Sequence, residues 1–188
     1  MKNLFFLLAG FIVLGMACTD PDLDPLQYDK ITKGSIIALR GTAVGVISDP
    51  ANRGAVDFFS KAGVLADEKF EIDAEFLSDD PSSLGEVQVY ARASADGARV
   101  RVATVPGSAF NPAGHDYPYG TISIPLSKIL TDLGKSASDF ADGSYIYIES
   151  DLQLTNGTIV PASAIVNESL FASFHFLPAN NCLYLVNP

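Results

Sequence analysis

Hydrophobic and polar residues alternate along most of the chain after Gly34. The alternation is clearest over residues 70–76, where apolar side chains occupy every second position and Glu71, Asp73 and Glu75 stand between them. This period of two predicts a strand with one buried face and one acidic, exposed face. The same pattern predicts further strands over residues 35–39, 86–92, 99–102, 121–124, 144–155, 158–160, 170–176 and 182–186.

Two dipeptides between these runs predict hairpin turns. Asp96-Gly97 lies between the runs at 86–92 and 99–102, which favours a tight turn there. Asn156-Gly157 follows the longest strand, and its composition predicts a two-residue hairpin with positive φ at both positions.

Only residues 126–133 have the apolar spacing of a helix, with Gly134 as the residue that ends it. Strands do not alternate with long helices, which argues against a doubly wound α/β fold. Among these runs, seven or eight short strands joined by turns instead predict an all-β fold. We expect residues 34–188 to form a single immunoglobulin-like β-sandwich with one short helix between strands.

Composition narrows the classes of function. The 188 residues contain 12 Lys and Arg against 22 Asp and Glu, a net charge of −10. Nucleic-acid binding and basic docking onto anionic lipid both need clustered Lys and Arg, so we expect neither. Two cysteines are too few for a disulfide framework.

The first 17 residues have the pattern of a signal peptide. Lys2 precedes a thirteen-residue apolar run at positions 4–16, which is shorter than the roughly 20 residues of a membrane-spanning helix. Ala17 directly before Cys18 resembles a bacterial lipobox, and that resemblance implies lipidation of Cys18. The alternative is an ordinary signal peptide in which Cys18 falls near the cut.

Residues 18–33 are expected to form an acidic, flexible tether. Asp20, Asp22 and Asp24 alternate like the early ligands of a calcium loop, but Pro21 and Pro25 stiffen the segment. No metal site is therefore predicted. Acidic residues after a lipidated cysteine resemble the surface-export signal of Bacteroidota lipoproteins, which implies a place on the outer face of the outer membrane.

The order of motifs after the tether resembles a group of Bacteroidota outer-membrane lipoproteins. The matching segments are residues 34–40, 85–90, 105–110, 126–134, 142–143 and 152–157. The resemblance implies an immunoglobulin- or fibronectin-like domain, often associated with nutrient-uptake receptor loci. Such proteins usually continue past this domain, so a function carried by a later domain is not expected of these residues. The shared motifs are structural and imply fold and location more than activity.

One loop gathers side chains suited to ligand binding. Residues 111–119 contain His115, Asp116, Tyr117 and Tyr119, and aromatic rings beside polar groups are what a sugar site needs. The alternative is a Pro-rich loop whose tyrosines cover the edge of the sandwich. A second candidate is the pair Tyr145 and Tyr147, which shares an outward face with Glu149 and forms either a binding platform or an apolar contact.

The sequence gives little indication of catalysis. The sequence has no catalytic signature of a hydrolase or nucleotide-binding enzyme. His175 is expected on a strand as a structural residue, Cys182 as a buried small hydrophobe, and Asp79-Asp80 as a loop cap.

We therefore expect a non-catalytic cell-surface lipoprotein that acts as a binding or structural module, without cofactor or metal. Its expected partners are the membrane, through the N-terminal lipid, and a surface protein complex or a glycan. A glycan-binding accessory protein of a nutrient-uptake system is the first alternative, and a small hydrolase is the second.

Overall fold

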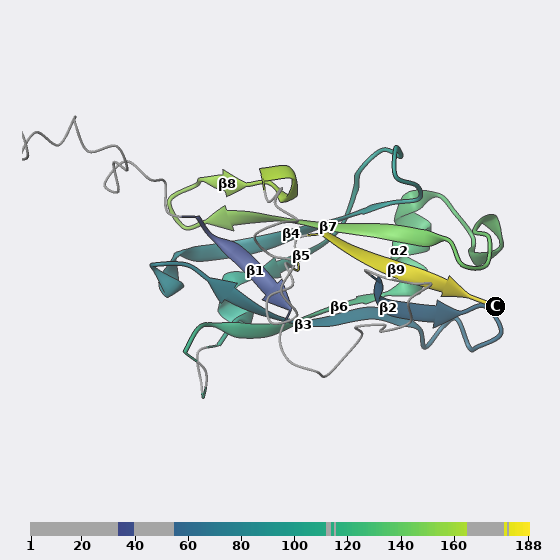
Figure 1. Cartoon of the computed structure of the whole chain (residues 1–188), viewed down its shortest axis with the longest axis horizontal. Coiled ribbons are helices and arrows are strands. Elements are labelled where there is room, and N and C mark those ends of the chain that lie inside the picture. The colour runs from purple at the N-terminus through teal and green to yellow at the C-terminus, as the bar shows by residue number, and fades with distance from the viewer. Residues whose placement is uncertain (1–33, 40–54, 112–113, 115, 165–178, 180) are drawn as a thin grey trace, which may run out of the picture. The chain divides into compact units, whose positions relative to one another are not determined.

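The strands after Gly34 form two sheets (Figure 1). A computed structural model of the chain describes residues 34–39, 55–111, 114, 116–164, 179 and 181–188, which belong to the unit Gly34–Pro188. The first sheet has the order β1-β3-β6, from Ile36–Leu39, Lys69–Leu77 and Tyr119–Pro125.

The second sheet has six strands, in the order β2-β9-β7-β4-β5 with β8 also paired to β7. Among the described strands, only β2 and β9 pair in parallel. The bounds are Ala55–Ser60 (β2), Leu84–Arg92 (β4), Val100–Pro106 (β5), Tyr145–Leu154 (β7), Ile159–Val160 (β8) and Asn181–Asn187 (β9).

A single apolar core lies between the two sheets. Every second residue of β3 points into it, and β6, β4 and β7 supply facing residues. Each fully buried aliphatic or aromatic side chain contributes roughly 1.5–3 kcal/mol. The largest fully buried residues of the core include Phe59, Phe70, Phe76, Ile72, Ile122, Ile124, Ile146, Ile148 and Tyr184.

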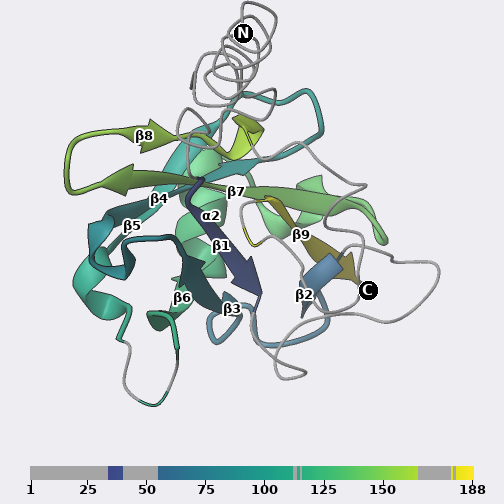
Figure 2. The same cartoon turned by 60° about the vertical axis from the view of Figure 1, so that its left-hand side comes forward.

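The helix α2, Leu126–Leu133, lies where the edge strands of the two sheets approach each other (Figure 2). It packs against β6 of the first sheet and β5 of the second. Its residues Leu126, Ile129 and Leu130 are buried, and Gly134 ends it in the left-handed conformation, with φ 63°. The predicted helix and its stop are therefore confirmed.

Four short 3₁₀ turns complete the described elements. They span Pro81–Ser83, Gly107–Ala109, Ala137–Asp139 and Ala162–Ala164. Over the described ranges, the mostly β architecture with one short helix agrees with the prediction. β2 was not predicted, because the sequence of residues 55–60 lacks a clear alternation. The strand predicted at 170–176, with His175, lies outside the described residues.

The outer face of β3 is less exposed than its alternating acids predict. Glu71 and Asp73 are half-buried and Glu75 is buried. Glu75 faces Tyr119 across the β3–β6 ladder, at the base of the loop that precedes β6. The prediction of an exposed acidic face is wrong at Glu75.

The Asn156-Gly157 turn differs from the predicted two-residue hairpin. Leu154 N–H donates to Thr158 O at 2.8 Å and Gly157 N–H donates to Leu154 O at 2.9 Å, which makes a three-residue loop. Gly157 takes positive φ, 87°. The Asn156 side chain accepts a hydrogen bond from Thr158 N–H at 2.9 Å, which holds the longer loop in place.

The connection at Asp96-Gly97 is also longer than predicted. Pairing of β4 with β5 ends at Ala91 and Val100, and Gly97 N–H donates to Ser94 O at 3.0 Å within the intervening loop. Gly97 is thus the fourth residue of the turn and not one of its central pair. Both arginines that flank the loop, Arg92 and Arg99, contact Glu149 on β7.

Candidate functional site

The loop of residues 111–119 is fixed at both ends. Asn111 N–H donates to Tyr119 O at 2.7 Å, and Tyr119 N–H donates back to Asn111 O at 3.1 Å. Next to this bridge, Phe76 N–H donates to Pro118 O at 2.8 Å, which extends the β3–β6 ladder by one residue. The base of the loop is therefore part of the first sheet.

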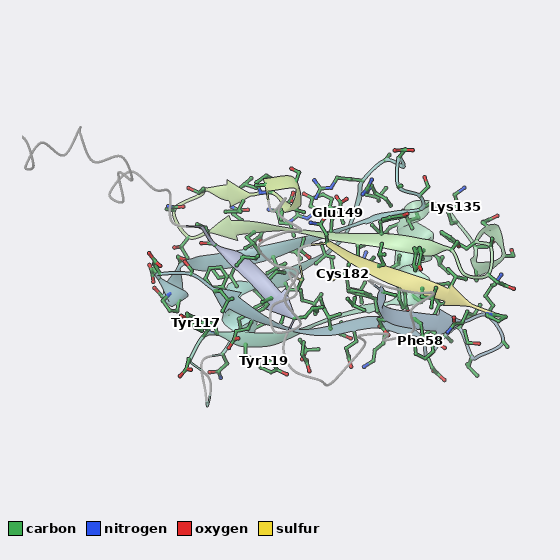
Figure 3. All side chains as sticks on the ribbon, in the orientation of Figure 1. Phe58, Tyr117, Tyr119, Lys135, Glu149 and Cys182 are labelled. Carbon is green, nitrogen blue, oxygen red and sulfur yellow. The ribbon has the colours of Figure 1, made fainter. Side chains whose placement is uncertain are left out.

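The described loop residues differ in exposure. Pro118 is buried and Tyr119 half-buried, whereas Asp116 is exposed and Tyr117 has 39% of its surface accessible. Figure 3 shows Tyr117 and Tyr119 on the side of the three-stranded sheet, away from Glu149. His115, the fourth predicted member of the site, lies outside the described residues.

Gly120, directly after the loop, is required by close packing. A Cβ at this position would lie 2.9 Å from Ala109 O and 3.1 Å from the Phe110 ring. Phe110 is buried at the other end of the loop. The glycine lets the two ends of the loop approach, so a small residue here helps to fix the loop's base.

A second cluster lies on the outward face of β4, β5 and β7, around Glu149. Arg92 Nη2 lies 2.5 Å from Glu149 Oε1, and Arg99 Nε lies 2.6 Å from Glu149 Oε2. Arg99 Nη2 also contacts Asp151 Oδ1 at 2.8 Å. One carboxylate thus joins two guanidinium groups, and a second carboxylate continues the network.

The two arginines also cover tyrosine rings. The Arg99 guanidinium lies 4.1 Å from the centre of the Tyr90 ring, and that of Arg92 lies 5.3 Å from the centre of the Tyr147 ring. Such contacts contribute about 0.5–2 kcal/mol each. Because Arg92 occupies a face of Tyr147, that face is not free to stack on a sugar, and the predicted Tyr145–Tyr147 platform is a poor sugar site.

Burial lowers the pKa of the Arg99 guanidinium, but the hydrogen bond to Asp151 and the charges of Asp151 and Glu149 outweigh it. The pKa of Arg99 therefore lies above its usual range. Asp151 is buried, and its Oδ1 also accepts a hydrogen bond from Ala162 N–H at 2.8 Å. The cluster thus ties the β4–β5 loop and the turn after β8 to β7.

Asp57 is a partly buried acid that the sequence analysis missed. Its carboxylate accepts hydrogen bonds from the N–H groups of Phe58 and Glu71, each at 2.8 Å. Burial raises the pKa of Asp57 to about 6, although those two hydrogen bonds lower it and the charges of Glu68 and Glu71 add to the rise. Asp57 links β2 of one sheet to β3 of the other and is a structural carboxylate.

Other candidate groups have structural roles. Asp80 accepts hydrogen bonds from the N–H and the hydroxyl of Ser82, at 3.0 and 2.6 Å, as a cap of the 3₁₀ turn at Pro81–Ser83. Cys182 is buried as expected, and burial raises the pKa of its thiol to about 12. Within the described ranges, no three His, Cys, Asp or Glu residues gather as a metal site would require.

An open cavity of about 650 Å³ lies at the end of the domain that carries Pro188. Lys61 lines it, and its ammonium group contacts Asp142 Oδ1 at 2.5 Å and Phe140 O at 2.9 Å. The lysine is thus held by two partners within the cavity wall.

The sequence pattern identifies only part of the cluster around Glu149. Tyr147 and Glu149 share a face by simple alternation, but their partners Arg92 and Arg99 flank a loop on another hairpin. Only the register between β4 and β7, which places Tyr90 opposite Glu149, brings the groups together.

No protein-family model matches the chain, and no curated protein matches its sequence. Among the described residues, no helix is long and apolar enough to span a membrane. The functional argument therefore rests on the chain's own residues.

Proposed function

We propose that the chain is a non-catalytic surface lipoprotein whose domain, residues 34–188, acts by binding. Cys18 carries the lipid and residues 18–33 are the tether, as the sequence pattern at the N-terminus indicates. The described carboxylates around β7 and α2 support a role in contacts rather than catalysis. Glu149, Asp151, Asp132 and Glu86 each take part in an ion pair.

We further propose that the sandwich is immunoglobulin-like. In that fold, counted as seven strands, the first, second, fourth and fifth strands share one sheet, and the third, sixth and seventh share the other. When β2 and β8 are left out of the count, the order β1-β3-β6 and the neighbours β4, β7 and β9 support this assignment, whereas the fourth strand, β5, pairs with β4 in the second sheet. The parallel strand β2 then forms an added edge beside β9.

The observation that carries the binding proposal is the loop of residues 111–119. Its base is fixed by hydrogen bonds at Asn111, Pro118 and Tyr119, while Asp116 and Tyr117 face solvent. A ligand that contacts side chains on a fixed base loses less conformational entropy on binding. An exposed ring beside a carboxylate fits a hydroxylated ligand, so a glycan is the ligand class that we propose.

The test is a glycan array followed by titration of each ligand found. We expect the double variant Tyr117→Ala, Tyr119→Ala to lose at least about tenfold in affinity, because each tyrosine contact is worth roughly 1 kcal/mol. The matched control is Phe58→Ala, which removes an aromatic side chain that is 49% exposed on β2.

Both variants must melt close to the wild-type temperature for the comparison to hold. Affinity that survives in the double variant, or that falls equally in Phe58→Ala, would contradict the assignment of the loop. Failure of every glycan to bind would contradict the ligand class.

A further inference from the structure

The chain enters the domain at the end of β3 that also holds the loop of residues 111–119. Ser35 lies directly before β1, and its Oγ atom is 3.1 Å from the Oγ atom of Ser78, just beyond the end of β3. Two residues earlier, the N–H of Phe76 donates to Pro118 O in the loop at 2.8 Å. β1 and β6 both run antiparallel to β3, so both begin at this end of the sheet.

The other end of the first sheet is distant from this junction. β3 spans Lys69–Leu77, and at roughly 3.3 Å per residue its two ends are about 26 Å apart. Asp67, which precedes β3, is exposed at the far end. Figure 3 shows Tyr117 towards one end of the sheets and Lys135 towards the other. The ligand loop therefore belongs to the end of the domain at which the tether is attached.

The length of the tether limits how far this end can lie from the membrane. Residues 18–33 connect the proposed lipid at Cys18 to Gly34, and a chain of this length spans at most about 58 Å when fully extended. The bilayer also excludes the body of the domain. Orientations in which the attached end faces the bilayer are therefore favoured over those in which the far end faces it.

We propose that the loop of residues 111–119 faces the bilayer and binds a glycan displayed on that same membrane. This inference rests on the proposed lipid anchor and glycan site. Contact through one exposed ring, Tyr117, is weak, with roughly 1 kcal/mol from stacking. A glycan on the same membrane meets the loop at a high effective concentration and so binds in spite of a weak contact. A glycan free in the medium lacks this advantage.

Lipid headgroups are poorer partners for this loop than sugars. Residues 111–119 contain no Lys or Arg, and Asp116 is exposed among them. Anionic headgroups bind clustered basic residues, and a chain with a net charge of −10 is repelled by them. The loop is better suited to the uncharged hydroxyl groups of a glycan that projects from the membrane.

The first test measures which end of the domain lies nearer the bilayer in the intact lipidated protein. Asp116→Cys and Asp67→Cys remove the same charge at opposite ends of β3, and each variant is labelled with a fluorescent maleimide. Cys182 is buried, and burial raises the pKa of its thiol to about 12, so it should stay unlabelled. The unsubstituted protein checks this, and thermal melts check that both variants are folded.

Energy transfer to acceptor lipids is measured in phosphatidylcholine vesicles. We expect greater transfer from position 116 than from position 67, because the two ends of β3 are about 26 Å apart. Equal transfer, or greater transfer from position 67, overturns the proposed orientation. This result does not depend on whether the loop binds a glycan.

The second test distinguishes a membrane-bound glycan from a free one. A glycan identified on the array is titrated in soluble form against the protein in phosphatidylcholine vesicles that carry the same glycan on a lipid. We expect its apparent dissociation constant to be at least about tenfold higher than when the same amount of glycolipid is in separate vesicles. Equal constants overturn the membrane as the source of the ligand. An array on which no glycan binds contradicts the proposed function and, with it, the ligand named here.

Discussion

Asp57 shows how one side chain joins the two sheets. β1 covers only Ala74–Leu77 of β3, so the N–H of Glu71 lies beyond the reach of that ladder. The Asp57 carboxylate supplies the missing acceptor from β2. This position is partly buried, and burial raises the pKa of the Asp57 carboxyl group to about 6.

This pKa predicts a pH dependence of stability. The native pKa lies above the ordinary value of 3.8, so the native state holds the proton more tightly than the unfolded state. We compare the free energy of unfolding of the wild type with that of Asp57→Asn. The difference, wild type minus variant, should be highest below about pH 4 and should fall as pH rises to 7. We expect a fall of about 1–2 kcal/mol, less than the full shift implies because Asp57 is partly exposed.

Denaturant unfolding of both proteins at several pH values measures this difference. Asp67→Asn removes the same charge from an exposed position and reports the general effect of charge. If the free energy of unfolding of the wild type rose with pH relative to that of Asp57→Asn, the result would contradict the account of Asp57.

Tyr184 carries a hydroxyl group within the apolar core. Its ring packs against Phe59 and Phe70, with centroid distances of 5.2 and 5.3 Å, and no described residue bonds its Oη atom. Tyr184→Phe keeps the ring contacts and removes the buried polar atom. We expect the free energy of unfolding to stay equal or to rise by about 1 kcal/mol.

The matched substitution is Tyr90→Phe, which removes a hydroxyl that donates to Gln88 Oε1 at 3.0 Å. That variant should lose about 1 kcal/mol, because a hydrogen bond is lost. Thermal or denaturant melts of the two variants give the comparison. A larger loss for Tyr184→Phe than for Tyr90→Phe would show that the Tyr184 hydroxyl is bonded.

At the scale of elements, the β7–β8 hairpin depends on one glycine. Gly157 has φ 87°, and a Cβ there would meet no other atom within 4 Å. Gly157→Val therefore tests backbone conformation without a steric clash. We expect a loss of about 1 kcal/mol or more, since a β-branched residue tolerates positive φ poorly.

Gly157→Asn is the control, because asparagine enters the left-handed region more readily than valine. It should lose less than Gly157→Val in a thermal melt. Equal melting temperatures for the two variants would contradict the role of positive φ at this turn.

Periodicity predicted the elements better than the connections between them. The strands over residues 70–76 and 144–155 follow from alternation, and α2 follows from helical spacing closed by Gly134. Loop lengths depend on contacts between distant residues. The β4–β5 loop is longer than its Asp-Gly pair predicts, and the two arginines that flank it, Arg92 and Arg99, contact Glu149 on another strand.

The sequence predicted only part of the candidate site. Composition identified Tyr117 and Tyr119, but which of them faces solvent depends on the pairing of Asn111 with Tyr119 and on the β3–β6 register. The cluster around Glu149 was missed because its members come from β4, β7 and the loop that precedes β5. Asp57 was missed because residues 55–60 lack a clear alternation, so β2 was not predicted.

At the scale of the whole molecule, the proposal combines a tether with a binding domain. The domain core is continuous between the two sheets and includes no described disulfide. The proposed ligand loop extends from the first sheet, and the cluster around Glu149 lies on the second. Lipidation at Cys18 would hold both surfaces at the membrane.

The most direct measurement is detergent-phase partitioning of wild type and Cys18→Ser, together with metabolic labelling by a radioactive fatty acid. We predict that the wild-type protein is labelled and enters the detergent phase. We predict that Cys18→Ser is unlabelled and enters the aqueous phase, because Cys18 is the proposed point of lipid attachment. A Cys18→Ser protein that remains in the detergent phase would contradict the account of a lipid-anchored binding module.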